Sequence, residues 1–187
     1  NIDIAGVPIN ANLLKSAGLE FEFFRNDEDA ADISRLKEIG VSAGDSIFVL
    51  GFPMNLAGQS RNYAIVRPGL LARFGDLIES ASDVLLIDSH VFPGNSGGPV
   101  ILAPQLIAIE GTKSNPRAYL VGMVRGFLPY SDIAISRHTG QPRVVCQDSS
   151  SLAEVVPILR LNEAILQWQQ AQAAKKTAAE REGRPER

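Results

Sequence analysis

The chain has 187 residues, of which 45% are hydrophobic and 21% are charged, and this balance excludes a wholly disordered protein. Its formal net charge is −3 at pH 7, so it lacks the basic surplus that phosphate neutralisation requires, and we expect no nucleic-acid partner. The apolar stretches 83–87 and 119–124 are much shorter than the roughly 20 residues of a membrane helix, so no membrane span is expected.

The supply of metal-binding and disulfide-forming side chains is small. Cys146 is the single cysteine, and His90 and His138 are the two histidines. We therefore expect no intrachain disulfide and no metal site, and the fold must be held by its apolar core. The sequence begins with Asn1 and enters an apolar alternation at once, so we expect an upstream part of the protein and leave its compartment open.

Glycine and proline interrupt many short apolar runs that are rich in Val and Ile, which indicates a mainly β fold. Most of these runs follow one another too closely for a helical crossover, so antiparallel pairing is expected. The predicted strands are residues 4–9, 46–51, 63–67, 84–88, 99–102, 106–112, 119–127 and 143–147.

Two segments have helical character. Residues 32–39 have helical composition and precede Gly40, a suitable helix stop. A longer helix is predicted to begin near Pro157, with an apolar face that we expect to dock on the β body. That face consists of Ile158, Leu161, Ile165 and Trp168.

The densest run of charge is acidic. Asp27, Glu28, Asp29 and Asp32 lack the ligand spacing and the glycine of a calcium-binding loop, so a solvated loop is expected.

One glycine-rich segment has the composition of a catalytic turn: Pro93-Gly94-Asn95-Ser96-Gly97-Gly98-Pro99. A serine between glycines can be held with its hydroxyl exposed and with backbone N–H groups directed at the same space. An ordinary hairpin turn is the simpler alternative. An α/β-hydrolase elbow, with Asp132 and His138, would need a helix after the serine, whereas residues 98–102 favour a strand.

Together with Asp88 and the apolar strand before it, the run Gly94-Asn95-Ser96-Gly97-Gly98-Pro99 resembles the catalytic serine loop of trypsin-like serine peptidases, most closely that of bacterial members. Residues 44–53 and 119–124 resemble two further strands of the same double β-barrel, the chymotrypsin fold. The resemblance implies that residues 1–39 end the first barrel and form a linker. Residues 40–157 would then form the second barrel, and residues 158–187 a C-terminal helix and tail.

The resemblance also implies the chemical roles. Ser96 would be the nucleophile, the N–H groups of Gly94 and Ser96 would form the oxyanion hole, and Asp3 would be the triad acid, with a peptide or protein as substrate and no cofactor. The triad histidine would lie upstream, so the chain by itself is expected to be nearly inactive. Alternatives are a catalytically inactive homologue that binds or scaffolds peptides, and an α/β-hydrolase-type esterase.

Two cationic residues are candidates for substrate binding. By its place in the resemblance His90 would lie at the floor of the primary pocket and Arg125 beside its wall, which favours an acidic or polar residue before the scissile bond. Cys146 stands in an apolar alternation near a strand end, so we expect a buried or half-buried free thiol. The sequence does not predict an oligomeric state.

Overall fold

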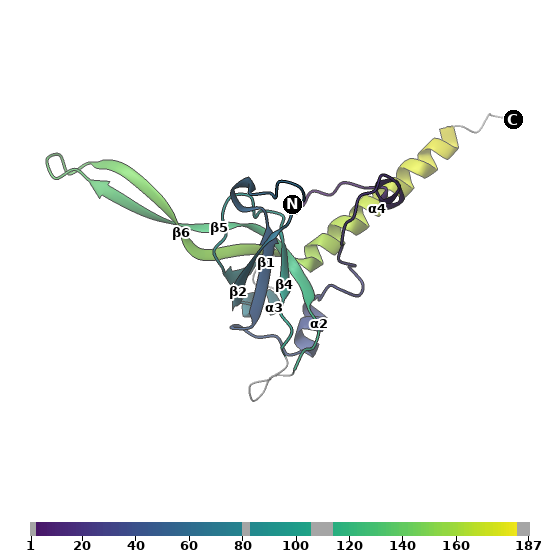
Figure 1. Cartoon of the computed structure of the whole chain (residues 1–187), viewed down its shortest axis with the longest axis horizontal. Helices are drawn as coiled ribbons and strands as arrows, with labels where there is room; N and C mark the ends of the chain where they lie inside the picture. Colours follow the sequence, from purple (N-terminus) through teal and green to yellow (C-terminus); the bar gives the residue numbers. More distant parts are fainter. Residues whose placement is uncertain (1–2, 80–82, 106–113, 183–187) are drawn as a thin grey trace.

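The computed structural model describes residues 3–79, 83–105 and 114–182. Six strands form one closed antiparallel barrel with the order β1-β2-β3-β6-β5-β4 (Figure 1). Because β4 returns to lie beside β1, the first four strands form a Greek key. The strands are β1 (Ser46–Gly51), β2 (Ile65–Arg73), β3 (Leu85–Asp88), β4 (Pro99–Leu102), β5 (Tyr119–Ile135) and β6 (Pro142–Pro157).

Alternation of buried and exposed residues builds the core. In β1 every second residue from Ile47 onward is buried, and in β2 the exposed residues alternate with partly or fully buried ones. Helix α2 (Ile33–Glu38), with Asp32 as its N-cap, adds Leu36 to the same core. Core residues from the strands include Ile47, Val49, Leu71, Leu85, Ile87, Val100, Leu102, Val121, Val124, Ala153 and Val155.

Strands β5 and β6 are much longer than the barrel needs. Beyond Phe127 and Ala153 their ladder continues as a two-stranded ribbon that projects away from the barrel (Figure 1). Its large apolar side chains, Ile133, Ile135, Val144 and Val145, are all exposed. Cys146 is exposed as well, so the prediction of a buried or half-buried thiol is wrong: the alternation is present, but no other described element covers the ribbon.

Helix α4 (Ile158–Glu182) begins directly where β6 ends and projects on the other side of the barrel (Figure 1). Ile158 is buried, but Trp168 is 47% exposed, so docking on the β body is limited to the start of the helix. Leu161, Ile165 and Trp168 instead line a cavity of about 580 Å³ with residues of the N-terminal segment, including Val7. Among the described residues no helix is long and apolar enough to cross a membrane.

Several other predictions can be compared with these elements. Strands 46–51 and 99–102 are confirmed with the predicted bounds, and those at 63–67, 84–88, 119–127 and 143–147 are found with different ends. The predicted strand at 4–9 is wrong, since those residues form no strand, and the one at 106–112 lies outside the described residues. Helices α1 (Ala11–Ser16) and α3 (Gly75–Ile78) and the 3-10 turn η1 (Pro53–Asn55) were not predicted.

The structure shows a single barrel. Residues 3–39 contain α1 and α2 but no strand, and their ladder contact with the barrel is one isolated bridge between Ala30 and Leu120. The double barrel that the resemblance implies is therefore not shown.

Candidate active site

Ser96 lies on the tight turn between β3 and β4, and it is exposed to solvent. The turn is closed by Asn95, whose N–H donates to Phe92 O at 3.0 Å and whose Oδ1 accepts from the Phe92 N–H at 3.2 Å. Asn95 is completely buried, and its backbone oxygen accepts from the N–H of Gly98 at 2.9 Å. The residue before the serine therefore anchors the turn, while the serine itself faces solvent.

Glycine is required at three positions of this turn for different reasons, and at Gly98 the reason is that a Cβ would collide with Leu50 O. Gly94 has φ of +96°, and a Cβ there would collide with Phe52 O and lie 3.1 Å from Met54 N. Gly97 has φ of +80° but open space around it. Gly94 is thus fixed by both its backbone conformation and a close backbone approach, and Gly97 by conformation alone.

Two backbone donors of the turn are unused. The N–H groups of Asn95, Gly97 and Gly98 all donate to carbonyl oxygens. Within residues 3–79, 83–105 and 114–182, the N–H groups of Gly94 and Ser96 have no such acceptor. These are the two donors that the resemblance assigns to the oxyanion hole.

The turn is attached to β5. The N–H of Gly97 donates to Val124 O at 2.8 Å, and the N–H of Val124 donates to Gly98 O at 2.9 Å. The next residue, Arg125, pairs with Asp3, with 3.2 Å between Nε and Oδ2. The structure therefore brings Asp3 and Arg125 together, and Arg125 directly follows Val124, the residue that is hydrogen-bonded to the serine turn.

The charge of Arg125 is compensated. Besides Asp3 it pairs with Glu154, with 3.2 Å between Nη1 and Oε2. The Asp3 side chain is 72% exposed and has no histidine partner among the described residues. The positive charge of Arg125 is thus shared between two carboxylates, and its role in substrate binding stays a prediction.

Neither of the two histidines is hydrogen-bonded to Ser96 among the described residues. His90 Nδ1 is 3.3 Å from Ser151 Oγ, and His138 lies in the turn between β5 and β6, at the tip of the projecting ribbon (Figure 1). Asp132 belongs to the ribbon too, opposite Cys146. Ser96 is followed by β4 and not by the helix that an α/β-hydrolase elbow needs. No group of three or more His, Cys, Asp or Glu in the described ranges is arranged to hold a metal ion.

Arg67, which the sequence analysis did not single out, lies against the serine turn. Its guanidinium is 5.0 Å from the ring centroid of Phe92, a residue hydrogen-bonded to Asn95. Arg67 Nε is buried and has no hydrogen-bond acceptor. The sequence contained one indication that Arg67 is unusual: a charged residue stands at a position that the alternation of its strand directs inward.

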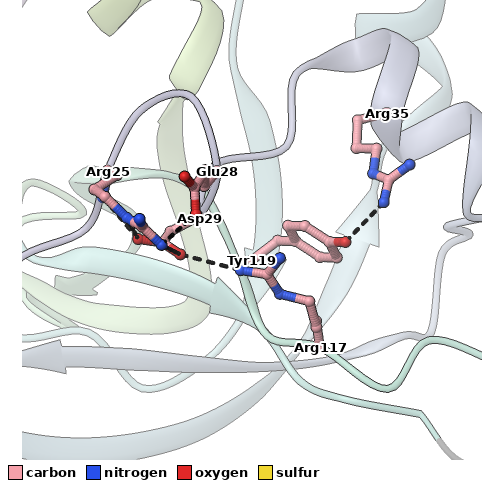
Figure 2. Close-up of polar contacts among 6 residues, drawn as sticks. All are labelled: Arg25, Glu28, Asp29, Arg35, Arg117 and Tyr119. Carbon is pink, nitrogen blue, oxygen red and sulfur yellow. Dashed lines mark hydrogen bonds and ion pairs between the residues drawn. The ribbon is translucent and has the colours of Figure 1, made fainter.

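A second polar cluster surrounds Tyr119 at the start of β5 (Figure 2). Tyr119 is 4% exposed, and the guanidinium groups of Arg35 and Arg117 lie 5.5 and 5.7 Å from its ring centroid. Arg35 also donates to Tyr119 Oη at 3.0 Å, which raises the pKa of Arg35. The cluster borders a cavity of about 500 Å³ between the segment before α2, β5 and α4.

The acidic run is only partly the solvated loop that was predicted. Asp29 pairs with Arg25 and Arg117, and the hydrogen bond from the Arg25 side chain lowers the pKa of Asp29 (Figure 2). The hydrogen bond from Ser34 Oγ lowers the pKa of Asp32, whose carboxylate also caps α2. Glu28 pairs with Arg25 as well, so three of the four carboxylates form ion pairs or side-chain hydrogen bonds.

No protein-family model matches the chain, and no curated protein matches it.

Proposed function

We propose that this chain carries the nucleophile and the oxyanion hole of a trypsin-like serine endopeptidase. The observation that carries the proposal is the Ser96 turn. It combines an exposed serine with two backbone N–H groups that have no acceptor among the described residues, and the buried Asn95 and the crowded Gly94 fix its shape.

In the proposed reaction Ser96 Oγ attacks the carbonyl carbon of a peptide bond and its proton passes to a general base. The negative charge on the carbonyl oxygen is stabilised by the N–H groups of Gly94 and Ser96, each worth about 3 kcal/mol in comparable sites. The amine leaves with the proton, and water then hydrolyses the acyl-enzyme. No cofactor takes part.

The base in this proposal is a histidine outside the 187 residues, because neither His90 nor His138 forms a hydrogen bond with Ser96 among the described residues. Asp3 would accept the hydrogen bond of that histidine and orient it. Arg125 supports this role by holding Asp3 beside β5, near the strand position that fixes the serine turn.

A second candidate function is peptide binding without catalysis. It is favoured by one observation: among the described residues the partner of Asp3, the proposed triad acid, is Arg125 and not a histidine. In that case the same turn would bind a peptide carbonyl without cleaving it.

Labelling with a fluorophosphonate probe tests the proposal on the full-length protein. We expect stoichiometric modification of Ser96, located by peptide mass spectrometry, and none in Ser96→Ala. Ser131→Ala, which alters an exposed serine of the ribbon, should label like the unaltered protein. A correctly folded full-length protein that the probe does not modify would overturn the peptidase proposal and favour the binding function.

A further inference from the structure

Arg67 differs from the other partly buried arginines. Arg35 and Arg160 each pair with a carboxylate, whereas the side chain of Arg67 forms no ion pair or hydrogen bond with any described residue. The guanidinium of Arg67 instead contacts the ring of Phe92, 5.0 Å from its centroid. An arginine held in place without an anion is costly unless something else supplies the acceptor.

The position of Arg67 places this charge beside Phe92, the residue that is hydrogen-bonded to Asn95 of the serine turn. In β2 it is aligned with Val49 of β1, which is completely buried, so Arg67 belongs to the inward-facing set of its strand. The next residue, Pro68, accepts a hydrogen bond from Ser89 Oγ at 3.2 Å. This part of β2 is therefore fixed against the residues that lead into the Ser96 turn.

The contact with Phe92 orients the guanidinium. The cation–π contact restricts where the charge can lie, and a guanidinium can bind a carboxylate through two parallel hydrogen bonds. The Nε atom is buried and lacks an acceptor. The side chain is thus oriented in advance and has unused donors.

Other cations near the turn are less available. Arg125 is shared between Asp3 and Glu154, and His90 has one ring nitrogen engaged by Ser151. Arg67 is the nearby cation with neither kind of partner.

From this we infer that Arg67 is the specificity-determining residue of the site and binds the carboxylate of a glutamate or aspartate in the peptide substrate. The inference rests on the proposed function, because it assumes that a peptide lies along the Ser96 turn.

The test measures binding, so that it does not depend on catalysis. Full-length Ser96→Ala protein is titrated by calorimetry with two blocked alanine-based peptides that differ only in one central residue, Glu or Gln. A hydrogen-bonded charge pair should make the Glu peptide bind about tenfold more tightly. Adding Arg67→Gln should remove the difference, and adding Arg67→Lys should retain part of it. Arg73→Gln, an exposed position of the same strand, should keep the full difference.

The inference is overturned if the Glu peptide binds no better than the Gln peptide, or if Arg67→Gln keeps the preference. Thermal unfolding verifies that each variant is folded. If Arg67→Gln does not fold, Arg67→Lys is used in its place. Failure of the proposed function is seen separately: unaltered protein that a fluorophosphonate does not label at Ser96, but that prefers the Glu peptide, refutes catalysis and keeps the acidic specificity.

Discussion

Replacement of Gly94 by alanine should destabilise the barrel more than the same change at any open glycine. Gly94 has φ of +96°, which costs a residue with a Cβ about 1–2 kcal/mol. The new methyl group would also collide with Phe52 O and press on Met54 N, which donates to Pro93 O at 2.7 Å. Overpacking of this kind adds about 1–3 kcal/mol, so we expect a total near 3 kcal/mol.

Two other glycines separate these contributions. Gly97 has φ of +80° with nothing within 4 Å of a Cβ, so Gly97→Ala should cost only the conformational part, about 1–2 kcal/mol. Gly126 has open space and no positive φ, so Gly126→Ala should stay within about 0.5 kcal/mol of the unaltered protein.

Urea unfolding followed by circular dichroism gives the three free energies by linear extrapolation. The expected order of loss is Gly94→Ala, then Gly97→Ala, then Gly126→Ala. If Gly94→Ala were no more destabilising than Gly97→Ala, the close approach of Phe52 to the turn would not be a real constraint on the serine loop.

Three further outcomes follow from single contacts. Tyr119→Phe removes the hydrogen bond from Arg35 and should cost about 1.5–3 kcal/mol in urea unfolding, and an unchanged stability would contradict that bond. Asp32→Ala removes the N-cap of α2 and should cost about 1 kcal/mol at neutral pH. Because the folded pKa of Asp32 lies below 3.8, that loss should be complete above pH 3.8 and shrink as the pH falls through the folded value, and a loss independent of pH down to acid unfolding would refute it. Cys146 should react with Ellman's reagent in the native protein as fast as a free peptide thiol, whereas reaction only after unfolding would show that the ribbon is covered.

The parts of the fold that the sequence predicted are those in which local pattern and pairing agree. β1 and β4 are apolar runs with charged, glycine or proline residues at their ends, and both were bounded correctly. β2 was predicted to end at Arg67, because Pro68 and Gly69 have the composition of a turn. Pairing with β1 carries the strand through both residues, pairing with β3 continues it from Leu70 to Arg73, and this long-range effect has no local signal.

The ribbon shows the same limit. Pro129, Ser131 and Asp132 lack the apolar alternation of a strand, yet each has a partner across the ladder in β6. In the candidate site, the glycines around Ser96 predicted a turn, since special backbone conformations restrict the residue type. Arg67 was not, because its importance depends on Phe92, 25 residues later in the chain.

The strand order has a consequence for synthesis of the protein. β6 is the last strand along the chain, and it inserts between β3 and β5. Before β6 emerges from the ribosome, the other five strands can form only an open sheet of order β3-β2-β1-β4-β5, with β3 and β5 as unpaired edges. The serine turn follows one of these edges and is bonded to the other through Val124. A nascent chain that has not yet reached Pro142 therefore presents two free strand edges beside the Ser96 turn, and the pairing of β6 with β3 and β5 closes both edges at once.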